Sequence, residues 1–118
     1  MATSKIPIVK NSVNGTVTLL QSGAQNSLAI RQYGNVITIT GYATGITLTA
    51  NTETKIGDIS GVPFPKEAAR TVCSVGGAGY EMGTASYCVI NTSGELRIRT
   101  SNGGSGKAVF FNITYIVE

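Results

Sequence analysis

Side chains that commonly carry out catalysis are scarce in this sequence of 118 residues. It contains no histidine, which is the commonest general base and the commonest metal ligand in proteins. Without histidine, neither a serine–histidine nor a cysteine–histidine nucleophile can be assembled. The sequence therefore predicts a protein that is not an enzyme and has no catalytic residue.

Acidic side chains are the remaining candidates for chemistry, and a glycosidase needs two carboxylates that flank the bond it cleaves. Any two of the six acidic residues could meet in space, so their spacing does not exclude a glycan depolymerase. Most of them stand at the ends or on the outward faces of expected strands, which favours solvated surface groups. They are Glu53, Asp58, Glu67, Glu81, Glu95 and Glu118.

The two cysteines, Cys73 and Cys88, are too few to form a zinc site in a chain without histidine. They stand almost symmetrically about a loop near Tyr80 and Glu81, so a regular hairpin would place them on neighbouring strands. Residues 1–10 contain no apolar signal segment, and we expect the chain to be made in the cytoplasm. This favours two buried free thiols over a disulfide. No metal and no cofactor is predicted.

Two glycine-rich segments have the composition of phosphate-binding loops without their pattern. Residues 101–107 end in a Gly-Lys pair, but a P-loop needs a further glycine upstream, where Ser101 and Asn102 stand. It also needs serine or threonine after the lysine, where Ala108 stands. Residues 76–83 have the wrong glycine spacing for a dinucleotide-binding loop. We expect both segments to be hairpin loops.

Such loops can nevertheless bind ligands, because a rigid scaffold holds them while their residues vary. In the first loop, residues 76–85, Tyr80 offers an amphipathic ring for stacking on a sugar, and Glu81 offers an acceptor for sugar hydroxyls. In the second loop, Asn102 can donate and accept hydrogen bonds, and Lys107 supplies a cation for phosphate. These four residues are the predicted ligand-binding residues. The alternative is that both loops only connect strands.

Strands are the elements expected to hold these loops, because apolar and polar residues alternate with a period of two. Fifteen threonines and fifteen glycines supply β-branched strand positions and turn positions. A helix of about one and a half turns is a candidate only at residues 65–70. The expected strands span residues 15–21, 27–33, 35–42, 45–50, 54–59, 70–75, 86–91, 95–100 and 108–117.

Short strands at this spacing are typical of an antiparallel β-sandwich or jelly-roll-like barrel, here with about eight to nine strands. Residues 1–13 are expected to form an N-terminal arm or linker, and residues 14–118 a single β-sandwich domain. No internal repeat is visible. The last strand has large apolar residues on both faces, including Phe110 and Phe111, which indicates a subunit interface or a centrally buried strand.

Charge and hydropathy argue against two classes of partner. The net charge is +3, and the nine lysines and arginines are scattered along the chain, whereas nucleic-acid binding requires clusters of them. No segment approaches the roughly 20 apolar residues that are needed to span a membrane. We therefore expect neither a nucleic-acid partner nor membrane insertion.

Four segments resemble, in their order and spacing, a known family of phage proteins. They are residues 31–42, residues 48–57 with the proline-containing break that follows, residues 87–98, and a terminal strand ending in residues 114–117. Together they are similar to the C-terminal receptor-binding (head) domains of tail-fibre and baseplate proteins from phages and prophages of Gram-positive bacteria. The resemblance covers roughly residues 28–118.

The resemblance implies a β-sandwich head at the tip of a virion tail that forms a homotrimer and contacts other tail proteins. It implies host adsorption by binding host cell-wall polysaccharide or teichoic acid, and a basic protein suits a polyanionic wall polymer. Family members usually follow a shaft or long upstream region, whereas only residues 1–27 precede the match here, and no ligand residue carries over. Two alternatives remain: a structural virion or tail component that contacts only viral proteins, and a glycan depolymerase.

Overall fold

The computed structural model describes residues 13–76, 86–101 and 103–117, of which 69% lie in strands and none in a helix. The predicted fold class is confirmed, since eight antiparallel strands close into a barrel and one further strand lies outside it. The nine strands of the described residues are β1 (Val13–Leu19), β2 (Gln25–Asn26), β3 (Ala29–Tyr33), β4 (Val36–Leu48), β5 (Thr54–Ser60), β6 (Ala69–Gly76), β7 (Ser86–Ile90), β8 (Glu95–Thr100) and β9 (Gly104–Ile116).

Two of the predicted strands, residues 35–42 and 45–50, form the single strand β4. Gly45, at the start of the second of them, has a φ of 71°, and the register between β4 and β9 shifts between Ala43 and Ile46. A β-bulge at this point takes up the positive φ while the strand continues. The predicted strands left a break at residues 43–44, and the structure has a bulge instead.

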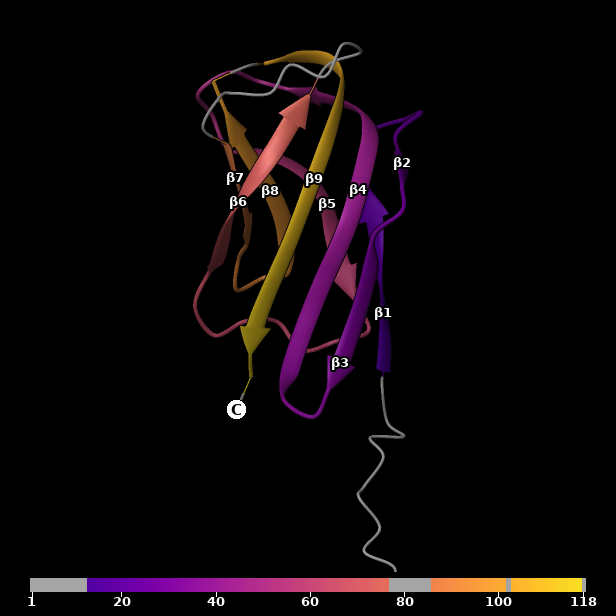
Figure 1. Ribbon diagram of the computed structural model, residues 1–118, viewed down its shortest axis with the longest axis vertical. Helices are drawn as coiled ribbons and strands as arrows, with labels where there is room; N and C mark the ends of the chain where they lie inside the picture. Colours follow the sequence, from indigo (N-terminus) through magenta and orange to yellow (C-terminus); the bar gives the residue numbers. More distant parts are fainter. Residues whose placement is uncertain (1–12, 77–85, 102, 118) are drawn as a thin grey trace, which may run out of the picture.

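Two smaller differences concern segments that were predicted as a turn and as a helix. The turn cluster of residues 22–26 includes β2, which pairs with Ala43 and Thr44 of β4. The helical candidate at residues 65–70 is wrong, because this segment has no helical turn and β6 already begins at Ala69. The chain between β5 and β6 instead crosses the lower end of the barrel (Figure 1).

Two contacts tie this crossing segment to the barrel. The Tyr115 hydroxyl, on β9, donates a hydrogen bond of 2.6 Å to the carbonyl oxygen of Pro63. The ring of Phe64 lies directly over Gly94, in the turn between β7 and β8. The segment is therefore anchored to β9 and to the turn between β7 and β8.

Two consecutive Greek keys build the barrel. The strands β1, β3, β4 and β5 lie in the spatial order β5-β1-β3-β4, and β6 to β9 lie in the order β9-β6-β7-β8. Each order places the fourth strand beside the first, which defines a Greek key. The keys join where β5 pairs with β8 and β4 pairs with β9. Every pairing within one key has a counterpart in the other, although the sequence shows no repeat.

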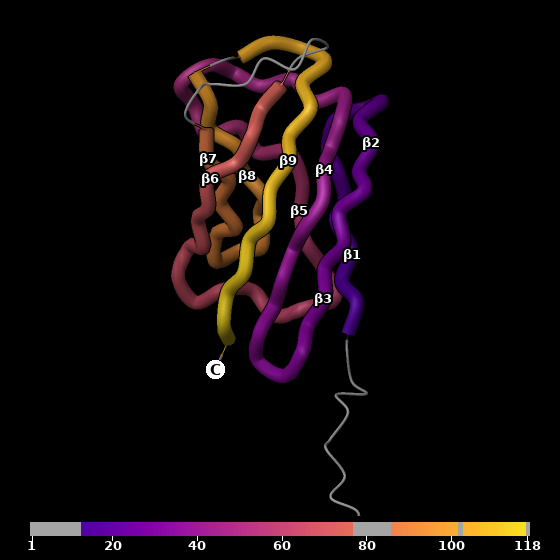
Figure 2. The backbone as a smooth tube through the Cα atoms, viewed as in Figure 1, coloured from indigo at the N-terminus to yellow at the C-terminus, as the bar shows by residue number. Residues whose placement is uncertain are grey.

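The first strand of each key carries the chain from one layer of the barrel to the other. In β1, residues 13–15 pair with β3 and residues 16–19 pair with β5. In β6, residues 69–73 pair with β7 and residues 74–76 pair with β9. The barrel is thus flattened into a front layer of β3, β4 and β9 and a back layer of β5, β8 and β7 (Figures 1 and 2).

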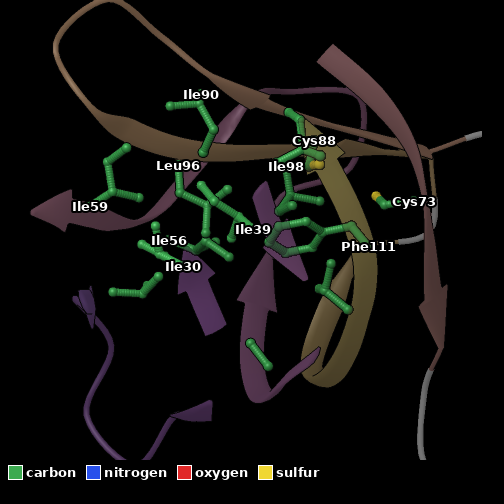
Figure 3. Close-up of a cluster of buried hydrophobic side chains, with 14 of the residues drawn as sticks. Ile30, Ile39, Ile56, Ile59, Cys73, Cys88, Ile90, Leu96, Ile98 and Phe111 are labelled. Carbon is green, nitrogen blue, oxygen red and sulfur yellow. The ribbon is translucent and has the colours of Figure 1, made fainter. Parts of the chain in front are cut away.

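The core between the two layers is rich in isoleucine, a β-branched residue that is favoured at the half-buried positions of strands. Ile39 from the front layer meets Ile56 and Ile98 from the back layer, and all three are fully buried (Figure 3). Cys73 and Cys88 lie in the same core as free, buried thiols, as predicted. Their strands pair Cys73 with Ser86 and Cys88 with Thr71, so the cysteines are diagonal neighbours rather than opposite ones.

Candidate ligand-binding site

Of the four predicted ligand-binding residues, Tyr80, Glu81 and Asn102 lie outside the described residues, and their roles stay predictions. Lys107 is described, and its side chain is only 9% exposed. It lies on the same side of β9 as the core residue Val109, and it already interacts with another group of the protein. Little of Lys107 is therefore open to a ligand.

An open pocket of about 340 Å³ lies on the outer face of β6, β7 and β8. Its volume is at the lower end of the range for small-molecule sites, which is roughly 300–1,000 Å³. A monosaccharide or one end of a longer chain matches this size. The pocket is lined by Asn51, Val72, Ser86, Tyr87, Arg99, Thr100 and Ser101.

Strand register brings the central lining residues together. Val72, Tyr87 and Arg99 lie directly opposite one another on β6, β7 and β8. They point outward because side chains alternate along a strand and their neighbours Cys73 and Cys88 point into the core. Val72 is 81% exposed, so a large apolar side chain is open to solvent beside an aromatic ring.

Hydrogen bonds hold the lining in place. The Tyr87 hydroxyl donates to a carboxylate oxygen of Glu53 at 3.1 Å. On the inward side of the strands behind the pocket, the Ser86 hydroxyl donates to that of Thr100 at 2.8 Å, and both residues are buried. The backbone N–H of Asn51 donates to the Thr100 carbonyl oxygen at 2.7 Å, which fixes the β4–β5 turn beside β8. A ligand would therefore meet side chains that are already ordered.

Two arginines surround Tyr87 with positive charge. Arg99 lies opposite it on β8, and Arg70 lies opposite Val89, two residues along β7. Partial burial raises the pKa of Tyr87 and the hydrogen bond to Glu53 raises it further, so the phenol stays protonated at neutral pH. Arg99 and Arg70 oppose that rise in the pKa of Tyr87, which indicates that both charges act on the hydroxyl.

The other cations on the outer face of the back layer, Lys55 and Arg97, form salt bridges with nearby acids. Arg97 bonds Glu95 at 2.8 Å, and Lys55 lies 3.1 Å from Glu95 and 3.2 Å from Asp58. Hydrogen bonds from Arg97, then Asn91 and Lys55, lower the pKa of Glu95 to about 2. By contrast, neither Arg70 nor Arg99 forms a salt bridge with any residue that the structure describes.

The outer face of the front layer has a different character. Tyr42 and Phe110 lie side by side on β4 and β9 with ring centroids 5.5 Å apart, and Ile116 is 65% exposed. The structure describes every residue of β3, β4 and β9, and Arg31 is the one charged residue among them that points outward. This face is therefore nearly uncharged, and it has exposed aromatic and aliphatic groups.

The described part of the chain contains no group of three or more histidine, cysteine, aspartate or glutamate side chains that could hold a metal ion. Within the same residues, no helix is long and apolar enough to cross a membrane. No protein-family model, curated protein sequence or solved structure matches the chain. Inferences about function therefore start from the geometry of the pocket and from the resemblance of the four segments.

Sequence reasoning missed the residues that line this pocket. Neither Tyr87 nor Val72 was among the predicted ligand-binding residues. The available signal was alternation, because Tyr87 precedes the inward Cys88 and must therefore point outward. Alternation likewise places Arg97 and Arg99 on one face of β8. It does not show that Tyr87 lies between Val72 and Arg99, since that follows from the pairing of β7 with β6 and β8.

Proposed function

We propose that this protein is a receptor-binding domain of a phage tail and that it adsorbs to host-cell carbohydrate through the pocket on β6, β7 and β8. The observation that carries the proposal is the amphipathic lining, in which the Tyr87 ring and exposed Val72 lie among hydroxyl, amide and guanidinium groups. A sugar ring has an apolar C–H face and a rim of hydroxyls, so it can use both kinds of contact. The four resembling segments support the assignment to a tail.

Order in the unliganded pocket adds to this argument. Binding loses free energy when mobile side chains must be immobilised, and tyrosine has few rotatable bonds to begin with. Here the Tyr87 hydroxyl is already held by Glu53. The ring can therefore present a face to a ligand at little entropic cost.

A binding experiment with matched aromatic variants tests the proposal. The purified protein is applied to Gram-positive cell walls and to a glycan array, and Tyr87→Ala is compared with Phe64→Ala. Phe64 is 42% exposed and lies in the segment between β5 and β6, outside the pocket lining. We expect Tyr87→Ala to weaken binding by about tenfold or more and Phe64→Ala to leave it unchanged.

Two outcomes would contradict the proposal. If the wild-type protein binds neither walls nor glycans, the function is wrong. If Tyr87→Ala binds as well as the wild type while thermal melting shows both folded, the site lies elsewhere. Adsorption without cleavage is also part of the proposal, so release of reducing sugar ends from a bound polymer would favour the depolymerase alternative.

We also propose that the domain works as a homotrimer whose copies meet through the outer face of the front layer. Strand β9 buries Phe111 and Ile113 in the core, whereas Phe110 and Ile116 point outward and are exposed. Because this face is nearly uncharged, copies can meet there without like-charge repulsion. A trimer would also repeat the pocket three times and raise avidity.

Solution mass tests the association. Sedimentation should give three times the chain mass of 12.2 kDa, and the double variant Phe110→Thr, Ile116→Thr should shift the mass toward one chain. A wild-type monomer at micromolar concentration contradicts the trimer. A stable trimer that binds no glycan would favour the structural-component alternative, since the same uncharged face could then contact other tail proteins.

A further inference from the structure

The charges on the outer face of the back layer are unevenly paired. Among the described residues of this face, four are cations, of which Lys55 and Arg97 are bound by Glu95 and Asp58. The remaining acid, Glu53, accepts the hydroxyl of Tyr87 at 3.1 Å and makes no salt bridge with Arg99. Within the described residues, the guanidinium groups of Arg70 and Arg99 therefore have no salt-bridge partner, and both lie beside the pocket.

The positions of these two arginines suit a ligand in the pocket. Arg99 is part of the lining, directly opposite Tyr87. Arg70 lies one strand beyond Tyr87 on the other side, and both guanidinium charges act on the Tyr87 hydroxyl. A guanidinium is planar and donates two parallel hydrogen bonds, a geometry that matches the oxygens of a carboxylate or a phosphate.

We propose that the pocket selects saccharides that carry an anionic group, phosphate or carboxylate, and that Arg99 binds this group while the sugar ring lies against Tyr87 and Val72. Arg70 adds positive potential from the far side of Tyr87. This inference rests on the proposed function, since it names the class of carbohydrate that the same site takes. It predicts a charge requirement that sugar stacking alone would not produce.

Three polymers serve as probes: poly(glycerol phosphate), polygalacturonate and uncharged dextran. Binding of the full chain is measured at low and at physiological salt for the wild type, Arg99→Gln, Arg99→Lys and Lys66→Gln. Lys66 is exposed in the segment between β5 and β6, outside the pocket lining and outside the outer face of the front layer, so Lys66→Gln removes the same charge elsewhere on the molecule. Melting curves confirm that each variant is folded.

We expect tight binding to one or both anionic polymers and little to dextran. Arg99→Gln should weaken anionic binding by about tenfold or more and reduce its salt dependence, whereas Lys66→Gln should change it by no more than about twofold. Arg99→Lys keeps the charge but loses the paired donors, so its affinity for the anionic polymers should lie between those of the other two variants. The relative affinity for the phosphate and uronate polymers identifies the source of the anion.

The outcomes separate this inference from the proposed function. Equal loss of binding in Arg99→Gln and Lys66→Gln would mean that only overall charge matters, and the inference would be wrong. Binding to neutral glycans alone, weakened by Tyr87→Ala, would also overturn it while the proposed function stands. If neither these polymers nor glycans and cell walls are bound, both proposals fail together.

Discussion

The contact between Gly94 and Phe64 allows a stability prediction that can be worked out in parts. Gly94 has a φ of 77°, a backbone conformation that costs an L-residue about 1–2 kcal/mol. An alanine Cβ at this position would lie 2.5 Å from Cε1 and 2.7 Å from Cζ of Phe64, so the ring must move. Phe64 is already 42% exposed, and losing its remaining packing costs about 1 kcal/mol. Gly94→Ala should therefore lower the free energy of unfolding by about 2–3 kcal/mol.

Urea denaturation of a double-mutant cycle tests both terms. In a Phe64→Ala background the ring is gone, so Gly94→Ala should cost only the backbone term of about 1–2 kcal/mol. The single variant should also melt about 8–12 °C lower than the wild type. A Gly94→Ala protein as stable as the wild type would refute the backbone argument. An equal cost in both backgrounds would refute the ring contact.

The remaining predictions concern a hydrogen bond, a carboxylate and the thiols. Tyr115→Phe removes the hydroxyl that bonds the crossing segment at 2.6 Å, and urea unfolding should show a loss of about 1 kcal/mol; an unchanged midpoint would contradict it. The pKa of Glu95 is lowered from 4.5 to about 2, first by Arg97, so its stabilising contribution is complete above pH 4.5 and is lost as the pH falls toward 2. Glu95→Gln should flatten that acid-side loss in unfolding measurements from pH 2 to 6, and an identical slope would show that other groups cause it. The pKa of the Cys88 thiol is raised by its hydrogen bond with Cys73 and by burial. Thiol titration without reductant should therefore count two thiols per chain only after denaturation. A count of zero in denaturant would reveal a disulfide.

Local alternation was enough to predict most strands, because inward and outward positions differ sharply in hydrophobicity. It failed where a distant partner decides the outcome. Strand β4 continues through Gly45 because β9 pairs with it along both of its halves. Strand β2 was missed because Gln25 and Asn26 are polar and its pairing with β4 leaves no apolar signal. The order of the two Greek keys likewise depends on pairings that no local pattern encodes.

The candidate site was harder to predict for a related reason. The composition of the glycine-rich loops favoured them as binding sites, but the pocket is formed by the pairing register of β6, β7 and β8. Lys107 could have been placed better, since it alternates with Val109 and Phe111 and therefore shares their inward side. Alternation alone would have placed Tyr87 and Arg99 outward, yet only strand pairing makes them neighbours.

The arrangement of the Greek keys has a consequence for how the chain folds. The first key leaves β4 and β5 as open edges, and only the second key covers them, through β9 and β8. Strand β4 ends at Leu48 and β9 begins at Gly104, so the longest pairing of the barrel closes a loop of more than fifty residues. Such pairings form slowly and leave strand edges exposed to other chains in the meantime. During synthesis the first key must wait with two unpaired edges until β9 has been made, so aggregation at this stage is the main hazard that the topology creates.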